Sequence, residues 1–416
     1  MKNSTTKAVQ PLTTYQAIAI LLLALTQFTV VLDFMVMSPL GDMLMKTMSL
    51  TTRQFGFAVS AYAFSAGISG LLTAGFADRF DRKKLLLFFY VGFIGGTLFC
   101  SMANTYKLLV AARIVTGLFG GVIGSISLAI VADIFTLNQR GRVMGFVQMG
   151  FGASQVLGIP ISLYIANKWG WQSPFIMIVA LATLVWIGTA VRLKPVVKHL
   201  EVKSDKNAFT HLWHTIRRRQ YRVGFLATAF LSIGGFMMMP WGSAFAINNL
   251  KVSVHQLPIL FMVGGIVALV IMPVVGKLSD RFDKFKVFAA AALWMLVVVV
   301  IYTHLAAVPF GVAIFMNIVM MIGIMSRTVP AMALTSSLPM MQDRGAFMSI
   351  NSSLQQIAGG IAAAVGGMVV VQATKTSPLQ HYDTLGWLVM VIIMVSIYLV
   401  YRVSKVVKAN QQVINQ

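Results

Sequence analysis

The charged stretch Asp78-Arg-Phe-Asp-Arg-Lys-Lys84 returns in the second half of the chain as Asp280-Arg-Phe-Asp-Lys-Phe-Lys286. Each copy lies between two long apolar runs, at a corresponding place in its half. A second matched pair, Arg140-Gly141 and Arg344-Gly345, precedes a later apolar run in each half. Repeats of this kind are typical of duplicated membrane proteins, so we predict two related halves in parallel orientation.

The apolar runs around these repeats are long enough to cross a membrane. Hydrophobic residues make up 58% of the 416 residues and charged residues only 11%, which is less than half of the roughly 25% found in soluble domains. A membrane-spanning helix needs about 20 apolar residues. The runs that meet this need are Gln16–Leu40, Gln54–Ala77, Leu85–Ala103, Tyr106–Ala132, Val143–Ile165, Ser173–Val191, Val223–Ile247, Leu257–Gly276, Val287–His304, Val308–Ser336, Ala346–Val371 and Leu385–Tyr401.

These spans define the fold class and the domains. We predict an all-α membrane protein with 12 transmembrane helices in two six-helix bundles. Residues 1–191 form the first bundle, residues 192–222 a basic linker and residues 223–416 the second bundle. The linker contains His211-Leu-Trp-His-Thr-Ile-Arg-Arg-Arg219, which we interpret as an amphipathic helix that binds lipid headgroups.

The basic residues predict the orientation in the membrane. If the N-terminus is cytoplasmic, 25 of the 33 Lys and Arg residues fall in cytoplasmic loops and tails, six in outer loops and two within spans. This bias follows the positive-inside rule, so we expect both termini in the cytoplasm. The net charge of +22 therefore marks topology and attraction to anionic lipids, and we expect no nucleic-acid partner.

Motifs that would indicate other functions are absent from the sequence. It has no phosphate-binding glycine loop, no zinc-protease motif and no serine-hydrolase elbow, so we do not expect an enzyme. It also has neither the arginine ladder of a voltage sensor nor a run that resembles a selectivity filter. Cys100 is the only cysteine, and the six histidines lack metal-ligand spacing, so we expect no disulfide, metal or cofactor. A secondary transporter is the leading class.

The repeated loop and two further motifs resemble those of the major facilitator superfamily, over nearly the whole chain. The loop Ala74-Gly-Phe-Ala-Asp-Arg-Phe-Asp-Arg-Lys-Lys84 is similar to the signature between spans two and three, except that Ala74 and Asp81 stand where the family has glycine. Arg113-Ile-Val-Thr-Gly117 resembles the fourth-span signature, and Gly158-Ile-Pro160 is a weakened form of the antiporters' fifth-span signature. The resemblance is greatest to bacterial drug-efflux permeases of the drug:proton antiporter type and to sugar-efflux permeases.

Asp33 is the one acid of the chain that falls deep in a predicted span. A charge in the middle of a membrane costs about 2.5–3.5 kcal/mol, so we interpret Asp33 as a proton-coupling site. The alternative is a structural carboxylate that is satisfied by hydroxyls or an arginine. Helical spacing places Thr26 and Thr29 on the same face. We expect Asp33→Asn to fold normally and to lose proton coupling.

Arg113 begins a face of the fourth span that continues through Gly117 and Gly121. We predict that this glycine face lets another helix pack closely. The resemblance implies that Arg113 takes part in proton coupling. The alternative is an arginine that snorkels to the outer surface, because Arg113 lies only about 10 Å into its span.

A set of polar and aromatic residues inside the spans is predicted to line a central cavity for a small-molecule substrate. Amides this deep in a membrane should face a cavity or bond across helices. Arg327, deep in the tenth span, could pair with substrate or with a backbone carbonyl. The predicted cavity residues are Gln148, Gln155, Trp241, Arg327, Asn351, Gln355 and Gln356.

The repeated loops are predicted to act as gates. Asp78 and Asp280 occupy matched positions, where a carboxylate can lie against a helix N-terminus or a cation in a contact that breaks when the cytoplasmic side opens. Their neighbours Arg79, Arg82 and Arg281 complete the predicted gating loops, although topology alone also produces basic loops.

We therefore predict a proton-coupled exporter of small organic molecules, acting as a monomer by alternating access in a bacterial cytoplasmic (inner) membrane. Its expected partners are the substrate, protons and membrane lipids. One alternative is a sugar or organic-anion transporter of the same fold, which Arg327 and the amides would suit. The other is a membrane receptor or scaffold with a transporter fold, and the short termini count against it.

Overall fold

The computed structural model is almost entirely helical. It describes the whole chain except residues 1–12, 74–78, 198–199, 201–207, 341–342 and 416. The first helices are α1 (Thr14–Val36), α2 (Gly41–Met48), α3 (Thr52–Thr73), α4 (Arg82–Ser101), α5 (Tyr106–Ile134), α6 (Leu137–Ala153), η2 (Ser154–Gly158), α7 (Ile159–Trp169) and α8 (Ser173–Arg192). They are followed by α9 (Ala208–Arg217), α10 (Arg219–Phe236), η4 (Met239–Trp241), α11 (Gly242–Asn248), α12 (Leu257–Arg281), α13 (Lys284–Thr303), α14 (Phe310–Ser336), α15 (Arg344–Val369) and α16 (Tyr382–Asn415).

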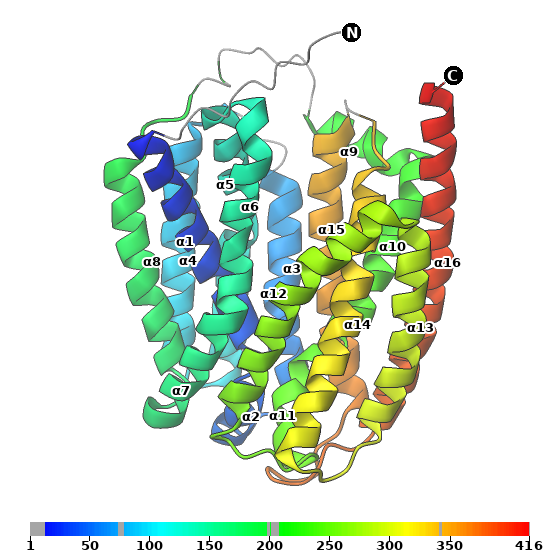
Figure 1. The fold of residues 1–416 in the computed structure, drawn as a ribbon. Coiled ribbons are helices and arrows are strands. Elements are labelled where there is room, and N and C mark those ends of the chain that lie inside the picture. The colour runs from blue at the N-terminus through cyan, green and yellow to red at the C-terminus, as the bar shows by residue number, and fades with distance from the viewer. Residues whose placement is uncertain (1–12, 74–78, 198–199, 201–207, 341–342, 416) are drawn as a thin grey trace.

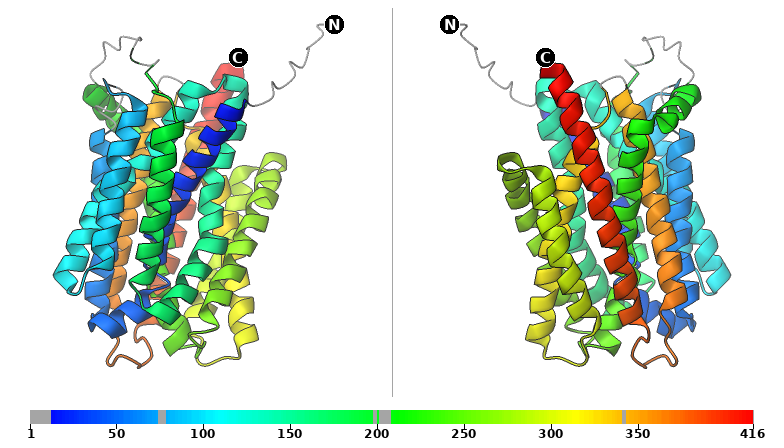
Figure 2. Two further views of the ribbon diagram at one scale, coloured as in Figure 1. Left: turned by 90° about the vertical axis from the view of Figure 1, so that its left-hand side faces the viewer. Right: turned by 90° about the vertical axis from the view of Figure 1, so that its right-hand side faces the viewer.

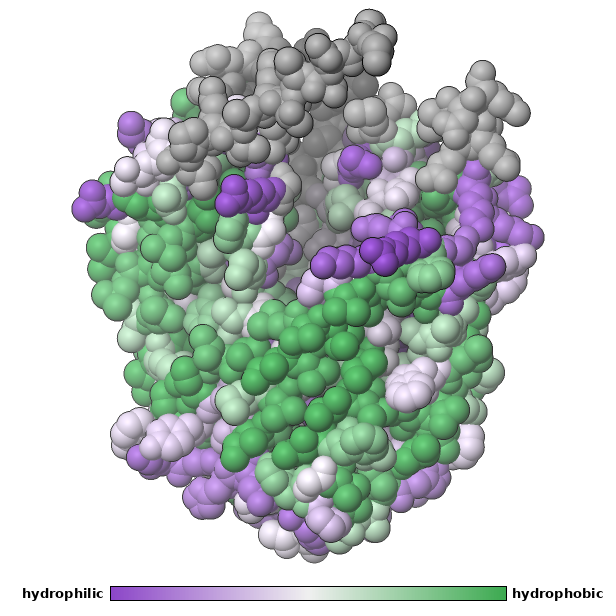
Figure 3. Space-filling view, in the orientation of Figure 1, coloured by the Kyte–Doolittle hydropathy of each residue, from purple (hydrophilic) through white to green (hydrophobic). Residues whose placement is uncertain are grey.

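Eleven helical segments of the described chain are long and apolar enough to cross a membrane. α15 adds a helix of similar length, 26 residues, whose serine and amide side chains lower its apolarity. It packs along α3, so much of its surface faces protein, where polar side chains are tolerated. Figure 3 shows an apolar belt over the middle of the molecule, with hydrophilic residues toward both ends. The all-α membrane fold predicted from the sequence is confirmed.

The helices form two halves that meet along α3 and α15. Figure 1 shows α1, α4 and α8 on one side of the molecule and α13, α14 and α16 on the other. α1 begins and α16 ends at the same end of the molecule (Figure 2), which we call the terminal face, while α2 and α11 lie at the opposite face. α12 contacts η2 and α7 but leans away from α6 toward the terminal face (Figure 1).

Glycines allow the central helices to approach each other closely. A Cβ atom added at Gly117 of α5 would lie 2.1 Å from Ser65 Oγ of α3, and one added at Gly121 would lie 2.5 Å from Ala66 Cα. Gly56 of α3 is similarly close to the backbone of α15. The predicted glycine packing face of the fourth span is confirmed, and the helix that it meets is α3.

The linker contains α9, and α10 begins at Arg219, four residues before the start predicted for the seventh span. One acid anchors this segment to the start of α15. Arg218 Nη1 lies 2.7 Å from Asp343 Oδ2, and Tyr221 donates a hydrogen bond to the same oxygen at 2.8 Å. α9 exposes Trp213, whose ring lies 4.8 Å from the Arg217 guanidinium, and its binding to lipid stays a prediction.

The second acid of each repeated loop begins a helix. Asp81 accepts a hydrogen bond from the backbone N–H of Lys83 at 2.9 Å and caps α4. Asp283 accepts one from the backbone N–H of Lys286 at 3.1 Å and caps α13. Aspartate is a favoured N-cap because its oxygen satisfies a backbone donor that the first helical turn leaves free. At Asp81 this role explains the departure from the family's glycine.

Candidate functional site

Asp33 of α1 and Arg113 of α5 form an ion pair inside the first half. Arg113 Nη1 lies 2.9 Å from Asp33 Oδ2 and 3.5 Å from the Asp33 backbone oxygen. Both side chains are 0% exposed. Because Asp33 lies in the last turn of α1 and Arg113 about 10 Å from the start of α5, the pair lies nearer the opposite face. Arg113 therefore points into the protein and does not snorkel to the surface.

Side chains from two more helices complete the surroundings of this pair. Thr97 of α4 donates a hydrogen bond to Asp33 Oδ1 at 3.2 Å. The ring centroid of Tyr62 on α3 lies 4.4 Å from the Arg113 guanidinium carbon, a distance at which an aromatic face attracts a cation. Removing one partner of a buried ion pair typically costs about 3–5 kcal/mol because the other charge is left alone. The pair therefore ties α1, α4 and α5 together.

Arg113 also has donors that the pair does not use. Its Nε and Nη2 atoms are buried and have no hydrogen-bond partner among the described residues. A guanidinium offers five N–H donors in a planar fork, so Arg113 can take a further acceptor without moving far. These free donors could bind another acceptor if Asp33 lost its charge.

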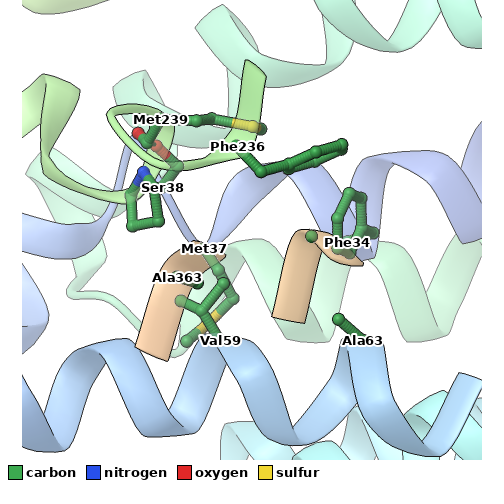
Figure 4. Close-up of a pocket in the computed structure, with 10 residues that line it drawn as sticks. Phe34, Met37, Ser38, Val59, Ala63, Phe236, Met239 and Ala363 are labelled. Carbon is green, nitrogen blue, oxygen red and sulfur yellow. Dashed lines mark hydrogen bonds between the residues drawn. The ribbon is translucent and has the colours of Figure 1, made fainter. Parts of the chain in front are cut away.

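A small, partly open pocket lies between the two halves, beside Phe34 and so close to this pair (Figure 4). Its wall is almost wholly apolar, and methionines give it side chains that adapt to irregular ligands. The residues that line it are Phe34, Met37 and Ser38 of the α1 end, Val59 and Ala63 of α3, Phe236, Met239 and Pro240 of the α10–η4 segment, and Gly359 and Ala363 of α15. Such an apolar lining suits contact with the apolar part of an organic molecule.

Aromatic contacts connect the ion pair to this pocket. Phe34 follows Asp33 directly, and its ring centroid lies 5.2 Å from that of Tyr62 and 5.9 Å from that of Phe236. Tyr62 in turn covers Arg113. These contacts thus form a continuous chain from the ion pair to a pocket wall that belongs to both halves.

None of the predicted cavity residues lines this pocket. Trp241 is fully buried against Phe55, with ring centroids 5.6 Å apart, and Arg327 is buried within the second half. Gln148 and Gln355 are exposed, and Gln155, Asn351 and Gln356 are half-buried. The apolar residues that do line the pocket carry no polar signal that a sequence search could use. The cavity role of the predicted residues stays a prediction.

The predicted gating residues are only partly in view. Asp78 lies outside the described residues, and Arg79, Asp280 and Arg281 are exposed. Arg82 Nε lies 2.7 Å from Asp133 Oδ2 of α5, a contact within the first half. The gating role of these loops stays a prediction.

In the second loop the paired acid is Asp283 rather than Asp280. Lys408 Nζ lies 2.6 Å from Asp283 Oδ2, and this hydrogen bond lowers the pKa of Asp283 below its usual value. The pair is therefore formed at neutral pH and is lost only as the pH falls through that lowered pKa. It ties the loop to α16 of the same half.

Polar contacts join the two halves at the opposite face. Asn248 Nδ2 of α11 donates to Asp42 Oδ1 of α2 at 2.6 Å, and Lys46 Nζ lies 2.7 Å from Asp42 Oδ2 and 3.3 Å from Asn248 Oδ1. Ser243 donates to the Ser38 backbone oxygen at 2.7 Å, and Ser38 donates to the backbone oxygen of Met239. We call Ser38, Asp42, Lys46, Ser243 and Asn248 the clamp.

Other hydrogen bonds between the halves lie beside the clamp or along α3 and α15. Thr52 donates to the Val370 backbone oxygen at 2.6 Å, and Ser60 donates to that of Gly360 at 2.8 Å. Within the described part of the chain, no such bond joins the halves at the terminal face. The hydrogen bonds between the halves that the described residues make therefore lie at the opposite face and along α3 and α15.

Comparison with known proteins places this arrangement in a family. Residues 23–364 and 225–412 match the Major Facilitator Superfamily. The chain is 22% identical over 376 residues to the uncharacterized MFS-type transporter YbcL of Bacillus subtilis (strain 168). The aligned region covers 90% of this chain and 94% of that relative. It is 24% identical over 255 residues to Multidrug resistance protein 2 of the same organism, and this aligned region covers 59% of this chain and 63% of that relative.

A solved structure has the same fold. It is the crystal structure of a bacterial homolog of the human lysosomal transporter Spinster, in an inward-facing and unoccupied conformation. The TM-score is 0.78 at 14% sequence identity, over 96% of this chain and 99% of that chain. The resemblance seen in the sequence motifs is confirmed, and the protein is a membrane transporter rather than an enzyme. The chain belongs to the major facilitator superfamily.

Proposed function

We propose that this transporter exports small organic molecules in exchange for protons. The observation that carries the proposal is the buried Asp33–Arg113 pair, which Tyr62 and Phe34 connect to an apolar pocket between the halves. An ionisable group inside a membrane is a candidate for proton transfer, and the apolar lining of the pocket suits contact with an organic substrate. A relative named Multidrug resistance protein 2 agrees with this class of substrate.

The pair supplies a route for coupling. When Asp33 is charged, it neutralises Arg113 and fixes its side chain. Protonation of Asp33 removes that attraction. Arg113 then still contacts the Tyr62 ring, and its own unused N–H groups can bind another acceptor. Tyr62 also touches Phe34 in the pocket wall, so proton binding and substrate binding act on the same ring. By linkage, each then changes the affinity for the other.

The proposal also requires a pocket that opens to either side in turn, as expected for two halves that meet around it. We propose that the terminal face is the cytoplasmic face of a bacterial inner membrane, since the basic residues concentrate in its loops and tails. The clamp closes the opposite face, and α12 leans away from α6 toward the terminal face. This arrangement suits loading from the cytoplasm, and the clamp must open for release outside.

The test first identifies an exported compound and then measures whether that compound drives proton movement. Cells that express the parent protein should accumulate less of at least one fluorescent organic compound from a panel, and a protonophore should abolish the difference. In reconstituted vesicles with an imposed pH gradient, that compound should drive proton flux through the parent and not through Asp33→Asn.

The matched control is Asp383→Asn, which changes an exposed acid at the start of α16 and should behave like the parent. Substrate-driven proton flux that persists in Asp33→Asn would remove Asp33 from the mechanism. Export that ignores the protonophore would exclude proton coupling.

A further inference from the structure

Arg327 is a buried cation without a hydrogen-bond or ion-pair partner among the described residues. It lies on α14 and is 2% exposed, yet its Nε and Nη1 atoms have no hydrogen-bond partner in the described part of the chain. None of the acids that the structure describes forms an ion pair with it. An isolated charge away from water is strongly unfavourable. The site therefore favours an anion beside this guanidinium.

Arg113, the other buried arginine of the described spanning helices, differs from Arg327 in having a carboxylate partner. Both arginines are buried inside membrane-spanning helices, but only Arg113 has a carboxylate, that of Asp33. Among the described side chains of the spanning helices, these three are the buried charged groups. Two bases against one acid leave one positive charge inside the protein. A pocket that binds cationic molecules would instead need more buried acids than buried bases.

The guanidinium of Arg327 lies against α10 of the same half. An added Cβ atom at Gly234 of α10 would be in ordinary contact with it, 3.8 Å from Nη2 and 3.9 Å from Nη1. Phe236 of the pocket belongs to the same helix but, two residues further on, to a different face of it. Arg327 lies about 14 Å along α14 from the terminal-face end of that helix, so the face from which an exporter loads is the nearer one.

We propose that Arg327 binds the acid group of the substrate, so that the exported molecules are organic anions such as carboxylates or sulfonates with an apolar body. The guanidinium fork matches the two oxygens of such a group and can bond both at once. This inference rests on the proposed export function and narrows its substrate class. It concerns binding at a different residue from the proton-coupling pair.

The experiment uses protein purified in detergent without added lipid. Ligand binding is measured as the rise in the melting temperature of the protein when the ligand is added. The probes are benzoate, cinnamate and indole-3-acetate, each beside its neutral primary amide, at constant pH and ionic strength. At least one acid should bind about tenfold or more tightly than its amide, since hydrogen bonds to charged groups contribute that much. Arg327→Met should lose this preference and Arg327→Lys should keep part of it.

Arg402→Met is the control, because Arg402 is an exposed arginine of α16. It should bind the acids as the parent does. Equal binding of acids and amides, no binding of any acid, or an unchanged preference in Arg327→Met would each overturn the proposal. Stabilisation by chloride alone, without a further effect of the acids, would show an inorganic-anion site and would also overturn it.

If Arg327→Met does not fold, the ratio of acid to amide binding in the parent and in Arg327→Lys decides. A ratio near one in the parent counts against the proposal. So does a ratio in Arg327→Lys that is unchanged from the parent, since lysine lacks the planar fork. The measurement uses no proton gradient, so its outcome is separate from that of the flux test on Asp33→Asn.

Discussion

Arg113 makes the buried charge of Asp33 tolerable, and this contact changes what Asp33→Asn should do. From the sequence alone the substitution is expected to fold normally, because it removes a charge from the membrane. In the structure it leaves Arg113 without its carboxylate, and losing one partner of a buried pair costs about 3–5 kcal/mol. Asparagine still accepts a hydrogen bond, so we expect the variant to fold with a lowered melting temperature.

A double variant separates this cost from the loss of coupling. Asp33→Asn/Arg113→Gln carries no buried charge at the site and should recover much of the stability that either single change loses. The coupling energy of the cycle should be about 0.5–3 kcal/mol, as for residues in direct contact. Thermal unfolding in detergent measures it. Single changes whose effects simply add would mean that the pair contributes nothing to stability.

Tyr62 is the residue through which proton and substrate should communicate. Tyr62→Phe keeps the ring that covers Arg113 and touches Phe34, so it should transport nearly as the parent does. Tyr62→Leu removes the ring, and we expect it to bind substrate while substrate-driven proton flux falls about tenfold or more, in line with the cation–ring attraction of a desolvated site. Vesicle flux, normalised to folded protein, is the measurement. Equal coupling in the leucine variant would contradict the proposed route.

At the scale of the helix, the α3–α5 contact should depend on the absence of a side chain. A leucine at Gly117 must displace Ser65 and the backbone oxygen of Tyr62, which lies 2.4 Å from an added Cβ. Overpacking typically costs about 1–3 kcal/mol or more. We expect Gly117→Leu to give scarce or aggregated protein in detergent extracts.

The matched control for this contact is Gly95→Leu on α4, where an added Cβ meets no atom within 4 Å. It should be extracted in normal amounts and as a monodisperse peak in size-exclusion chromatography. Normal yield of Gly117→Leu would instead mean that α3 and α5 can move apart freely.

The helices were largely predictable and the contacts between them were not. Apolar run length placed the spans, because the membrane requires that length whatever the neighbours are. The first run was predicted to reach Leu40, but α1 ends at Val36 and the chain turns there into α2. Partners such as Asn248 for Asp42 lie far apart in sequence. Single-sequence patterns carry no information on which distant helices meet, so these contacts needed the structure.

The sequence identified the charged residue of the candidate site but not the apolar residues around it. Asp33 stood out because a carboxylate is rare inside a span, and the structure gives it Arg113 as its partner. Phe34 and Phe236 did not stand out, because an apolar residue in an apolar helix is expected everywhere. Their role follows only from where α1 and α10 come together around the pocket.

At the scale of the whole molecule, the clamp sets which side of the pocket is closed. Asn248→Ala removes the hydrogen bonds of Asn248 to Asp42 and Lys46 and so weakens the contact between the halves at the opposite face. A hydrogen bond to a charged group contributes about 1.5–3 kcal/mol. Because transport conformers differ by only a few kcal/mol, this loss should raise the population that is open at the opposite face about tenfold or more.

Labelling of a pocket cysteine measures this shift. Met37 lines the pocket and is 0% exposed, so Met37→Cys in the parent should react slowly with a membrane-impermeant maleimide added outside the cell. Adding Asn248→Ala should speed the reaction about tenfold, while Cys100, which is buried, gives the background. The control is Asn249→Ala, which breaks hydrogen bonds to Leu379 within one half and should leave the rate unchanged. Similar rates in all three proteins would mean that the clamp does not decide between the two conformers, and the closed opposite face would then depend on the packing of α3 against α15.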